Sequence, residues 1–144
     1  TMATLPDCDI FIGAAAVADY RPITIAQQKI KKSSSSMQIE LTRNPDIIAA
    51  VASHAARPFT VGFAAETQDV EAYARGKLEN KKLDLIIAND VANSDIGFNS
   101  DNNAVSLIWK QGSKALAIAS KLRLSRLILE EINALYRAQS PVDR

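Results

Sequence analysis

Two lysines, Lys77 and Lys81, stand four residues apart in a polar, helix-forming stretch. Side chains at this spacing share one face of a helix, so the two ammonium groups would project together. Such a pair suits the charge of a triphosphate, although a solvated helix surface is the commoner origin of the spacing. Lys29, in the basic run 29–32 before four serines, has two similar interpretations: a movable lysine over phosphates, or an ordinary charged loop.

A small-residue segment, 13–20, follows the short apolar run 9–13 and reads Gly-Ala-Ala-Ala-Val-Ala-Asp-Tyr. Small side chains would let a ligand approach the backbone N–H groups closely. Asp19 could accept hydrogen bonds from a base or a ribose. Alanines packed beneath a helix, with Asp19 as a cap, explain the same pattern about equally well.

Residues 62–67, Gly-Phe-Ala-Ala-Glu-Thr, repeat this design after a second apolar run. Phe63 could stack on a nucleobase, but a lone Phe is more often part of a core. Glu66 could hold a metal, orient a substrate or cap the next helix. The pattern leaves these interpretations open.

The elements that must position these residues alternate between strand and helix. Short apolar runs bounded by Gly or Pro predict three buried strands, at 9–13, 59–63 and 83–88. The triplet Asn44-Pro45-Asp46 predicts a helix start with Asn44 as N-cap, and this helix should run to about residue 56. A polar helix is expected over 67–82, capped by Thr67 or Asp69.

The C-terminal third predicts a hairpin and one long helix. The hairpin strands are expected at 104–109 and 115–119, and Ser120 should start the helix. The whole pattern predicts an α/β fold, Rossmann-like, with three layers around a parallel sheet and a C-terminal antiparallel hairpin. We expect a single domain over 1–144 that lacks its opening part. In such sheets ligands bind beyond the carboxyl ends of the strands, where 13–20 and 62–67 fall.

Residues 20–42 interrupt this alternation. Pro22 predicts irregular structure over 20–28, and the serines at 33–36 predict a flexible tract. A short strand is expected over 37–42, with which 29–31 could pair.

The bulk composition excludes several classes of protein. With 144 residues and 47% hydrophobic content, the chain has enough material for one core. The net charge of +1 implies no bulk attraction to nucleic acid or to a membrane surface, and no apolar run approaches the ~20 residues of a membrane span. The single cysteine, Cys8, forms no internal disulfide, which suits a reducing compartment and a cytoplasmic protein. One histidine and one cysteine do not favour a structural zinc site.

The sequence matches two familiar motifs only in part. Gly76-Lys77 resembles the end of a P-loop, but Glu71 stands where the first glycine belongs and Leu78 replaces Ser or Thr. Tyr73 and Lys77 have the Tyr-x-x-x-Lys spacing of short-chain dehydrogenases, without the Gly-rich dinucleotide loop that should precede it. An NADPH-dependent reductase using Tyr73 and Lys77 is therefore a second hypothesis. A non-catalytic nucleotide-binding dimerisation module is a third.

Six segments in their order and spacing resemble the phosphopantothenate–cysteine ligases, or phosphopantothenoylcysteine synthetases, which form the C-terminal half of a bifunctional bacterial coenzyme A biosynthesis protein. The segments are 15–22, 29–32, 44–47, 62–67, 88–91 and 97–103. The resemblance covers about residues 9–136. It implies that CTP activates the carboxylate of 4′-phosphopantothenate as an acyl-cytidylate, which the amine of cysteine then attacks. Mg²⁺ would bridge the triphosphate.

The resemblance also implies roles for particular residues. Asp19 and the backbone of Ala15 and Ala16 would read cytosine and ribose, and Phe63 would line the nucleotide pocket with backbone contacts from Ala64. Three lysines would bind the triphosphate: Lys29, Lys77 and Lys81. The three lysines would also stabilise the charge that develops during transfer, and Lys29 would be the catalytic one. No residue is assigned as a metal ligand.

The same resemblance implies a homodimer, in which 20–42 serves as lid and dimerisation segment. The sites would then lie near the interface, with Lys29 reaching over the partner's pocket. A glycine- and serine-rich segment of the family would precede Thr1, so residues 1–144 by themselves are expected to be inactive. The flavin-binding half of the bifunctional protein is not matched, so no FMN is expected here.

Overall fold

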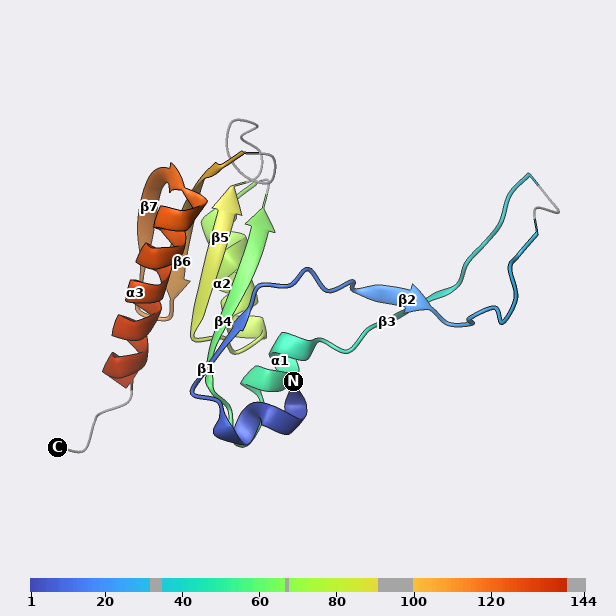
Figure 1. Cartoon of the computed structure of the whole chain (residues 1–144), viewed down its shortest axis with the longest axis horizontal. Helices are drawn as coiled ribbons and strands as arrows, with labels where there is room; N and C mark the ends of the chain where they lie inside the picture. The colour runs from blue at the N-terminus through green and yellow to red at the C-terminus, as the bar shows by residue number, and fades with distance from the viewer. Residues whose placement is uncertain (32–34, 67, 91–99, 140–144) are drawn as a thin grey trace.

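A five-stranded sheet forms the centre of the molecule (Figure 1). The computed structural model describes residues 1–31, 35–66, 68–90 and 100–139. In spatial order the strands are β1 (Ile10–Gly13), β4 (Phe59–Glu66), β5 (Leu85–Asp90), β6 (Asn102–Trp109) and β7 (Gly112–Ser120). The first three are parallel and the last two antiparallel. The predicted parallel sheet with a C-terminal antiparallel hairpin is confirmed.

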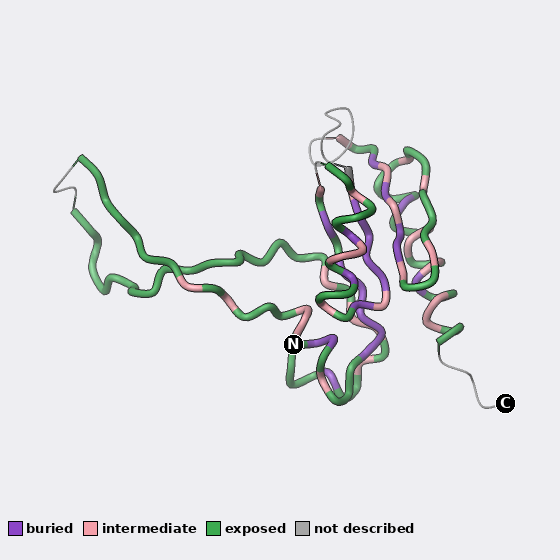
Figure 2. The backbone as a smooth tube through the Cα atoms, turned by 180° about the vertical axis from the view of Figure 1, so that it is seen from behind, coloured by how far each residue is buried: buried purple, intermediate pink, exposed green. Residues whose placement is uncertain are grey.

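Helices cover both faces of this sheet and complete the three layers. The helices are α1 (Ile47–Ala52), α2 (Val70–Asn80) and α3 (Lys121–Gln139). The central strand β5 contributes apolar side chains to both faces of the sheet. Ile86 and Ala88 pack in the core beneath α1 and α2, whereas Leu85 and Ile87 pack in the core beneath α3. Because successive side chains of a strand point to opposite faces, β5 is buried on both sides, as Figure 2 shows.

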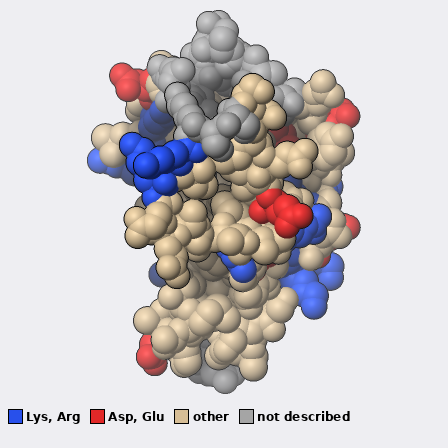
Figure 3. Space-filling view, turned by 90° about the vertical axis from the view of Figure 1, so that its right-hand side faces the viewer, with Lys and Arg blue, Asp and Glu red and all other residues tan. Residues whose placement is uncertain are grey.

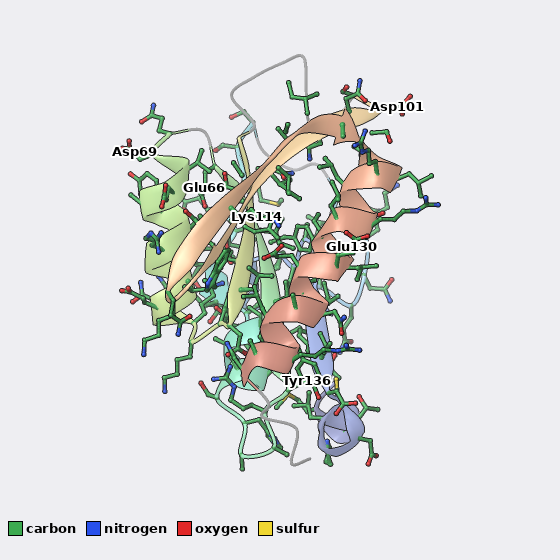
Figure 4. All side chains as sticks on the ribbon, turned by 90° about the vertical axis from the view of Figure 1, so that its left-hand side faces the viewer. Glu66, Asp69, Asp101, Lys114, Glu130 and Tyr136 are labelled. Atoms are coloured by element: carbon green, nitrogen blue, oxygen red, sulfur yellow. The ribbon has the colours of Figure 1, made fainter. Side chains whose placement is uncertain are left out.

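The long C-terminal helix begins as the sequence predicts. The Ser120 hydroxyl accepts a hydrogen bond from the Arg123 N–H at 3.3 Å, which caps the first turn. Leu124 and Ile132 of α3 are buried against the sheet. Lys114 of β7 forms an ion pair with Glu131 of α3, which ties the helix to the hairpin. Figure 4 shows α3 lying along the hairpin side of the sheet. No helix among the described residues is long and apolar enough to cross a membrane.

The start of α1 differs from the prediction. Asp46, rather than Asn44, is the N-cap, and its Oδ1 accepts a hydrogen bond from the Ala49 N–H at 3.1 Å. The helix also ends at Ala52, short of residue 56. The helix packs very close to the sheet at Gly13. A Cβ atom added to Gly13 would lie only 2.9 Å from the Ile48 Cδ1 atom. Glycine at this position leaves the room that Ile48 occupies.

The start of α2 and the burial of β1 also differ from the prediction. Helix α2 begins at Val70; Asp69 is its N-cap residue but makes no capping hydrogen bond through its side chain, and Thr67 lies outside the described residues. The strand β1, expected to be buried on both faces, is half-buried, and Ile12 keeps 40% of its surface exposed. The reason is that β1 is the edge strand of the sheet.

Residues 20–43, which we call the arm, project away from the sheet and are exposed along almost all of their described length (Figures 1 and 2). The predicted pairing of 29–31 with 37–42 is wrong: the paired strands are β2 (Tyr20–Pro22) and β3 (Leu41–Arg43). Pro22, taken as a sign of irregular structure, is the last residue of β2, a position that a two-stranded ribbon with free edges accepts. Residues 32–34, part of the basic and serine-rich run, lie outside the described residues.

Candidate functional site

A hollow of about 460 Å³ opens where the chain leaves β1. The register of β1 ends at Gly13 opposite Gly62, so the last residues of β4 have no partner on that side. The chain then runs outward as residues 14–19, which we call the wall, before entering the arm. The start of α1 and three side chains from β4 and the α2 region close the hollow: Phe63, Lys77 and Lys81.

Six of the eight sequence-predicted site residues line this one hollow. They are Ala15, Ala16, Asp19, Phe63, Lys77 and Lys81. Ala64 instead packs in the core, with 8% of its surface exposed, because its side chain faces α2. Only its backbone remains available for the predicted contact. Lys29 does not line the hollow; it lies on the arm and is exposed.

The wall offers hydrogen-bond donors. Within the described part of the chain, the N–H groups of residues 15–18 have no acceptor, whereas the carbonyl oxygens of Ala18 and Asp19 accept hydrogen bonds from Asn44. Successive unpaired N–H groups suit an anion or the acceptor atoms of a polar ligand. The carboxylate of Asp19 makes no hydrogen bond or ion pair with the described residues, so it is available to a ligand donor.

Each lysine of the hollow is held by a carboxylate from a different element. Lys77 Nζ lies 2.6 Å from Glu66 Oε1 at the end of β4, and Lys81 Nζ lies 3.0 Å from Asp46 Oδ2 before α1. Figure 4 places Glu66 on the α2 side of the sheet, away from α3. An incoming polyanion would therefore share or replace these carboxylates. Glu66, for which the sequence left three roles open, here orients Lys77.

The charge of Asp46 is favoured by its surroundings. Burial acts to raise the pKa of its carboxyl, but hydrogen bonds from the Ala49 N–H and from Lys81, together with the charge of Lys81, bring the pKa below its ordinary value of 3.8. Asp46 therefore stays ionised at neutral pH while it caps α1 and holds Lys81.

Positive charge is local on this side of the molecule. The face from which the arm projects shows Lys and Arg in small separate groups, with Asp and Glu between them (Figure 3). This distribution agrees with the net charge of +1. Anion recognition would therefore depend on the individual lysines of the hollow, which act over a short range.

Sequence reasoning missed three residues of this region. Asn44 and Asp46 line the hollow, although the sequence marked them as a helix start and as part of the segment 44–47, without a role in the site. Asn89, which belongs to the segment 88–91 and lies near the end of β5 outside the lining of the hollow, has a buried Oδ1 atom with no hydrogen-bond partner among the described residues. A buried acceptor without a partner is costly, and an N–H group of a ligand would satisfy it.

A metal ion at the hollow would need ligands from a bound phosphorylated molecule. Among the described residues, no group of three or more His, Cys, Asp or Glu side chains could hold a metal ion. Mg²⁺ commonly uses one or two carboxylates and completes its shell with substrate phosphates and water. Asp19, which has no protein partner, could supply such a carboxylate.

The reductase hypothesis finds little support in this geometry. Lys77 lines the hollow, but Tyr73 does not, and 56% of the Tyr73 surface is exposed on α2. A tyrosine that transfers a proton to a substrate in the hollow would have to reach it.

Comparisons with known proteins agree on one family. Residues 1–136 match the family described as the DNA/pantothenate metabolism flavoprotein C-terminal domain. The coenzyme A biosynthesis bifunctional protein CoaBC of Vibrio vulnificus (strain YJ016) is 59% identical over 137 residues, covering 93% of this chain and 34% of the relative. CoaBC of Escherichia coli (strain K12) is 51% identical over 140 residues, with the same two coverages. The chain thus spans about a third of the length of these curated relatives.

Solved structures give the same picture. The crystal structure of the C-terminal domain of CoaBC superposes with a TM-score of 0.73 at 31% identity, covering 95% of this chain and 59% of that chain. A Cab2 mutant in complex with phosphopantothenate-cysteine superposes with a TM-score of 0.69 at 20% identity, covering 93% of this chain and 47% of that one. At that identity the second likeness shows the fold only.

Proposed function

Because the chain belongs to the family of the DNA/pantothenate metabolism flavoprotein C-terminal domain, we propose that it provides the phosphopantothenate–cysteine ligase activity of coenzyme A biosynthesis. The proposal rests on one observation: the same hollow is lined by the wall with its unpaired N–H groups, by the free carboxylate of Asp19 and by two lysines. These are the groups that a nucleoside triphosphate and a carboxylate substrate require. The similarity to CoaBC proteins supports the same substrate class.

The reaction has two steps. A carboxylate oxygen of 4′-phosphopantothenate attacks the α-phosphorus of CTP, the bond to the β-phosphate oxygen breaks, and pyrophosphate leaves. The amine of cysteine then attacks the carbonyl carbon of the acyl-cytidylate, the bond to the CMP oxygen breaks, and the amine loses a proton as the amide forms. Both steps move negative charge, so catalysis depends on positioning and charge neutralisation.

Lys77 and Lys81 neutralise the triphosphate in this proposal. Their carboxylate partners hold both ammonium groups at the hollow before the nucleotide arrives, which reduces the conformational entropy lost on binding. Pyrophosphate leaves more readily when its charge is balanced. Mg²⁺, bound with the triphosphate, would supply further charge neutralisation on the phosphates.

The base and ribose are recognised by the wall and by β4. N–H groups of residues 15–18 donate to acceptor atoms of the nucleotide, and Asp19 accepts from its N–H or hydroxyl groups. Phe63, with 42% of its surface exposed at the hollow, offers a ring face for stacking. These contacts suit CTP, our proposed nucleotide.

The arm brings two copies of the chain together. Its exposed apolar side chains are Ile23, Ile25, Ile30, Met37, Ile39 and Leu41. Several of them line a second hollow of about 510 Å³ on the arm itself. Apolar side chains on so thin a ribbon have no core of their own chain to enter, which favours burial against a second copy. Lys29 then reaches the hollow of the partner, since it does not line its own.

The test is a product assay on the intact protein. With CTP, Mg²⁺, 4′-phosphopantothenate and cysteine we expect pyrophosphate, CMP and phosphopantothenoylcysteine in equal amounts, measured by chromatography and mass spectrometry. With cysteine omitted, pyrophosphate should appear without CMP while the acyl-cytidylate remains bound. Release of the γ-phosphate instead of pyrophosphate, or oxidation of NADPH, would refute the proposal.

A further inference from the structure

We propose that Asn44 is a positioning residue that fixes the wall of the hollow and joins it to the root of the arm. This inference rests on the proposed nucleotide-binding function of the hollow. Asn44 lies immediately after β3 and lines the hollow, so it stands where the arm returns to the body of the molecule.

Asn44 makes two hydrogen bonds to the wall. Its side-chain Nδ2 donates to the carbonyl oxygen of Ala18 at 2.7 Å, and its backbone N–H donates to the carbonyl oxygen of Asp19 at 2.8 Å. One residue thus holds two consecutive carbonyl groups. Because a trans peptide unit is planar, fixing the Ala18 carbonyl also fixes the direction of the next N–H, which points the opposite way.

The other half of the Asn44 amide holds the arm. Its Oδ1 accepts a hydrogen bond from Arg21 Nη1 at 2.8 Å, and the same Nη1 donates to the carbonyl oxygen of Arg43 at 3.2 Å. Arg21 belongs to β2, and Arg43 is the last residue of β3. The donor of one amide therefore serves the wall, and its acceptor serves the arm.

This division has a chemical consequence for the hollow. The acceptor atoms of Ala18 and Asp19 are turned toward Asn44, while the Asp19 N–H, which shares a peptide unit with the Ala18 carbonyl, has no acceptor in the described part of the chain, like the N–H groups of residues 15–18. The wall consequently presents donors to an electron-rich ligand. Without Asn44 the carbonyl groups of Ala18 and Asp19 could rotate toward the hollow. The wall would then present hydrogen-bond acceptors to a ligand as well as donors.

The test compares variants that separate the two contacts, in the intact protein with CTP and Mg²⁺ as the probe. Asn44→Ala loses both side-chain contacts. Asn44→Asp still accepts from Arg21, but its carboxylate cannot donate to Ala18. Arg21→Gln leaves the wall contacts in place. Asn80→Ala is the matched control, because Asn80 is exposed at the end of α2 and outside the hollow.

We expect calorimetry to show that Asn44→Ala and Asn44→Asp each weaken CTP binding about 10-fold, with Arg21→Gln and Asn80→Ala within about 2-fold of wild type. Hydrogen exchange of the peptide 14–22 should accelerate in both Asn44 variants. A purely structural role would lower the melting temperature and leave the CTP affinity unchanged, and that result would overturn the proposal.

Failure of the proposed function gives a different result. If wild-type protein binds no CTP, the nucleotide assignment fails, and the positioning role is decided by hydrogen exchange. Unchanged exchange of 14–22 in Asn44→Ala would then overturn it, whereas faster exchange would support it.

Discussion

Lys81 Nζ lies 3.0 Å from Asp46 Oδ2, and this ion pair joins the C-cap of α2 to the N-cap of α1 at the hollow that both residues line. The two residues are far apart in sequence. Their contact positions a lysine that is predicted to bind phosphate, and it involves the residue that caps α1. A related pair, Lys77 and Glu66, lies at the end of β4.

Removing one lysine charge should weaken nucleotide binding. We expect Lys77→Gln and Lys81→Gln each to raise the dissociation constant for Mg²⁺ and CTP by roughly 10- to 100-fold, since a hydrogen bond to a charged group contributes ~1.5–3 kcal/mol. Calorimetry at two salt concentrations measures the effect. Lys110→Gln is the control, because Lys110 lies in the β6–β7 turn, outside the hollow. Equal CTP affinities for all three variants would show that Lys77 and Lys81 do not bind the nucleotide.

The charge of Asp46 should make stability depend on pH. Its pKa in the folded protein is below the ordinary value of 3.8, so its stabilising contribution is present above that value and is lost as the pH falls through the lower folded pKa. Asp46→Asn keeps a good N-cap but loses the attraction to Lys81. Because the Asp46 side chain is 45% exposed, we expect a difference of only a few tenths of a kcal/mol at pH 7.

Urea unfolding of wild type and Asp46→Asn at several pH values tests this expectation. The difference between the two proteins should shrink toward zero as the pH falls through the lowered pKa of the Asp46 carboxyl, where this group becomes protonated. Asp46→Ala, which also loses the cap, should be less stable by about 1 kcal/mol at every pH above that range. A difference between wild type and Asp46→Asn that grows on acidification would contradict the ion-pair account.

Complementation between Lys29→Gln and Lys77→Gln, assayed at a CTP concentration too low for either variant to be active, tests whether Lys29 acts on the partner in the proposed dimer. In a mixed dimer of Lys29→Gln and Lys77→Gln, one hollow receives an intact Lys77 from its own chain and an intact Lys29 from the other. We therefore expect ligase activity to return when the two inactive proteins are exchanged into mixed dimers. Continued inactivity, with mixed dimers verified by mass spectrometry, would place Lys29 in its own hollow or outside the site.

A charge placed on the arm should separate the proposed dimer. Ile25 is 83% exposed on the arm, so Ile25→Asp costs the single chain little and opposes burial against a second copy. Sedimentation velocity should show a shift from dimer to monomer. Ile118→Asp on β7, at 61% exposure, is the matched control and should leave the assembly unchanged. A dimer that resists Ile25→Asp but not Ile118→Asp would place the interface on the hairpin.

Tyr73→Phe distinguishes the ligase from the reductase. Tyr73 does not line the hollow, so the ligase proposal expects CTP binding and product formation within about 2-fold of wild type. A reductase that uses Tyr73 and Lys77 would lose activity with NADPH.

Much of the sheet could be predicted because its pattern is local. The apolar runs around β1, β4 and β5, and the Ser120 cap of α3, depend on neighbouring residues, and the parallel order follows from the intervening helices. The small-residue segments after β1 and within β4 could also be placed at one edge, because parallel strands end together. Composition and spacing were sufficient for these features.

The sequence could not show which distant side chains meet. Asn44 looked like a helix cap, but its amide is taken by Ala18 and Arg21, so Asp46 caps α1 instead. The arm strands could not be identified from 29–42, because a two-stranded ribbon buries too little apolar surface to leave a clear pattern.

The sequence by itself determined the order of strands and helices and the kinds of residue at the strand ends, since these follow from the spacing of apolar and small residues. Only the tertiary structure decided that Lys77 and Lys81 face the wall, that carboxylates hold both lysines, and that Lys29 stands apart on the arm. The physical reason is that such contacts depend on strand register and on how closely α1 and α2 pack against the sheet. Those distances are set by the whole core, and Gly13 and Ile48 are the clearest example.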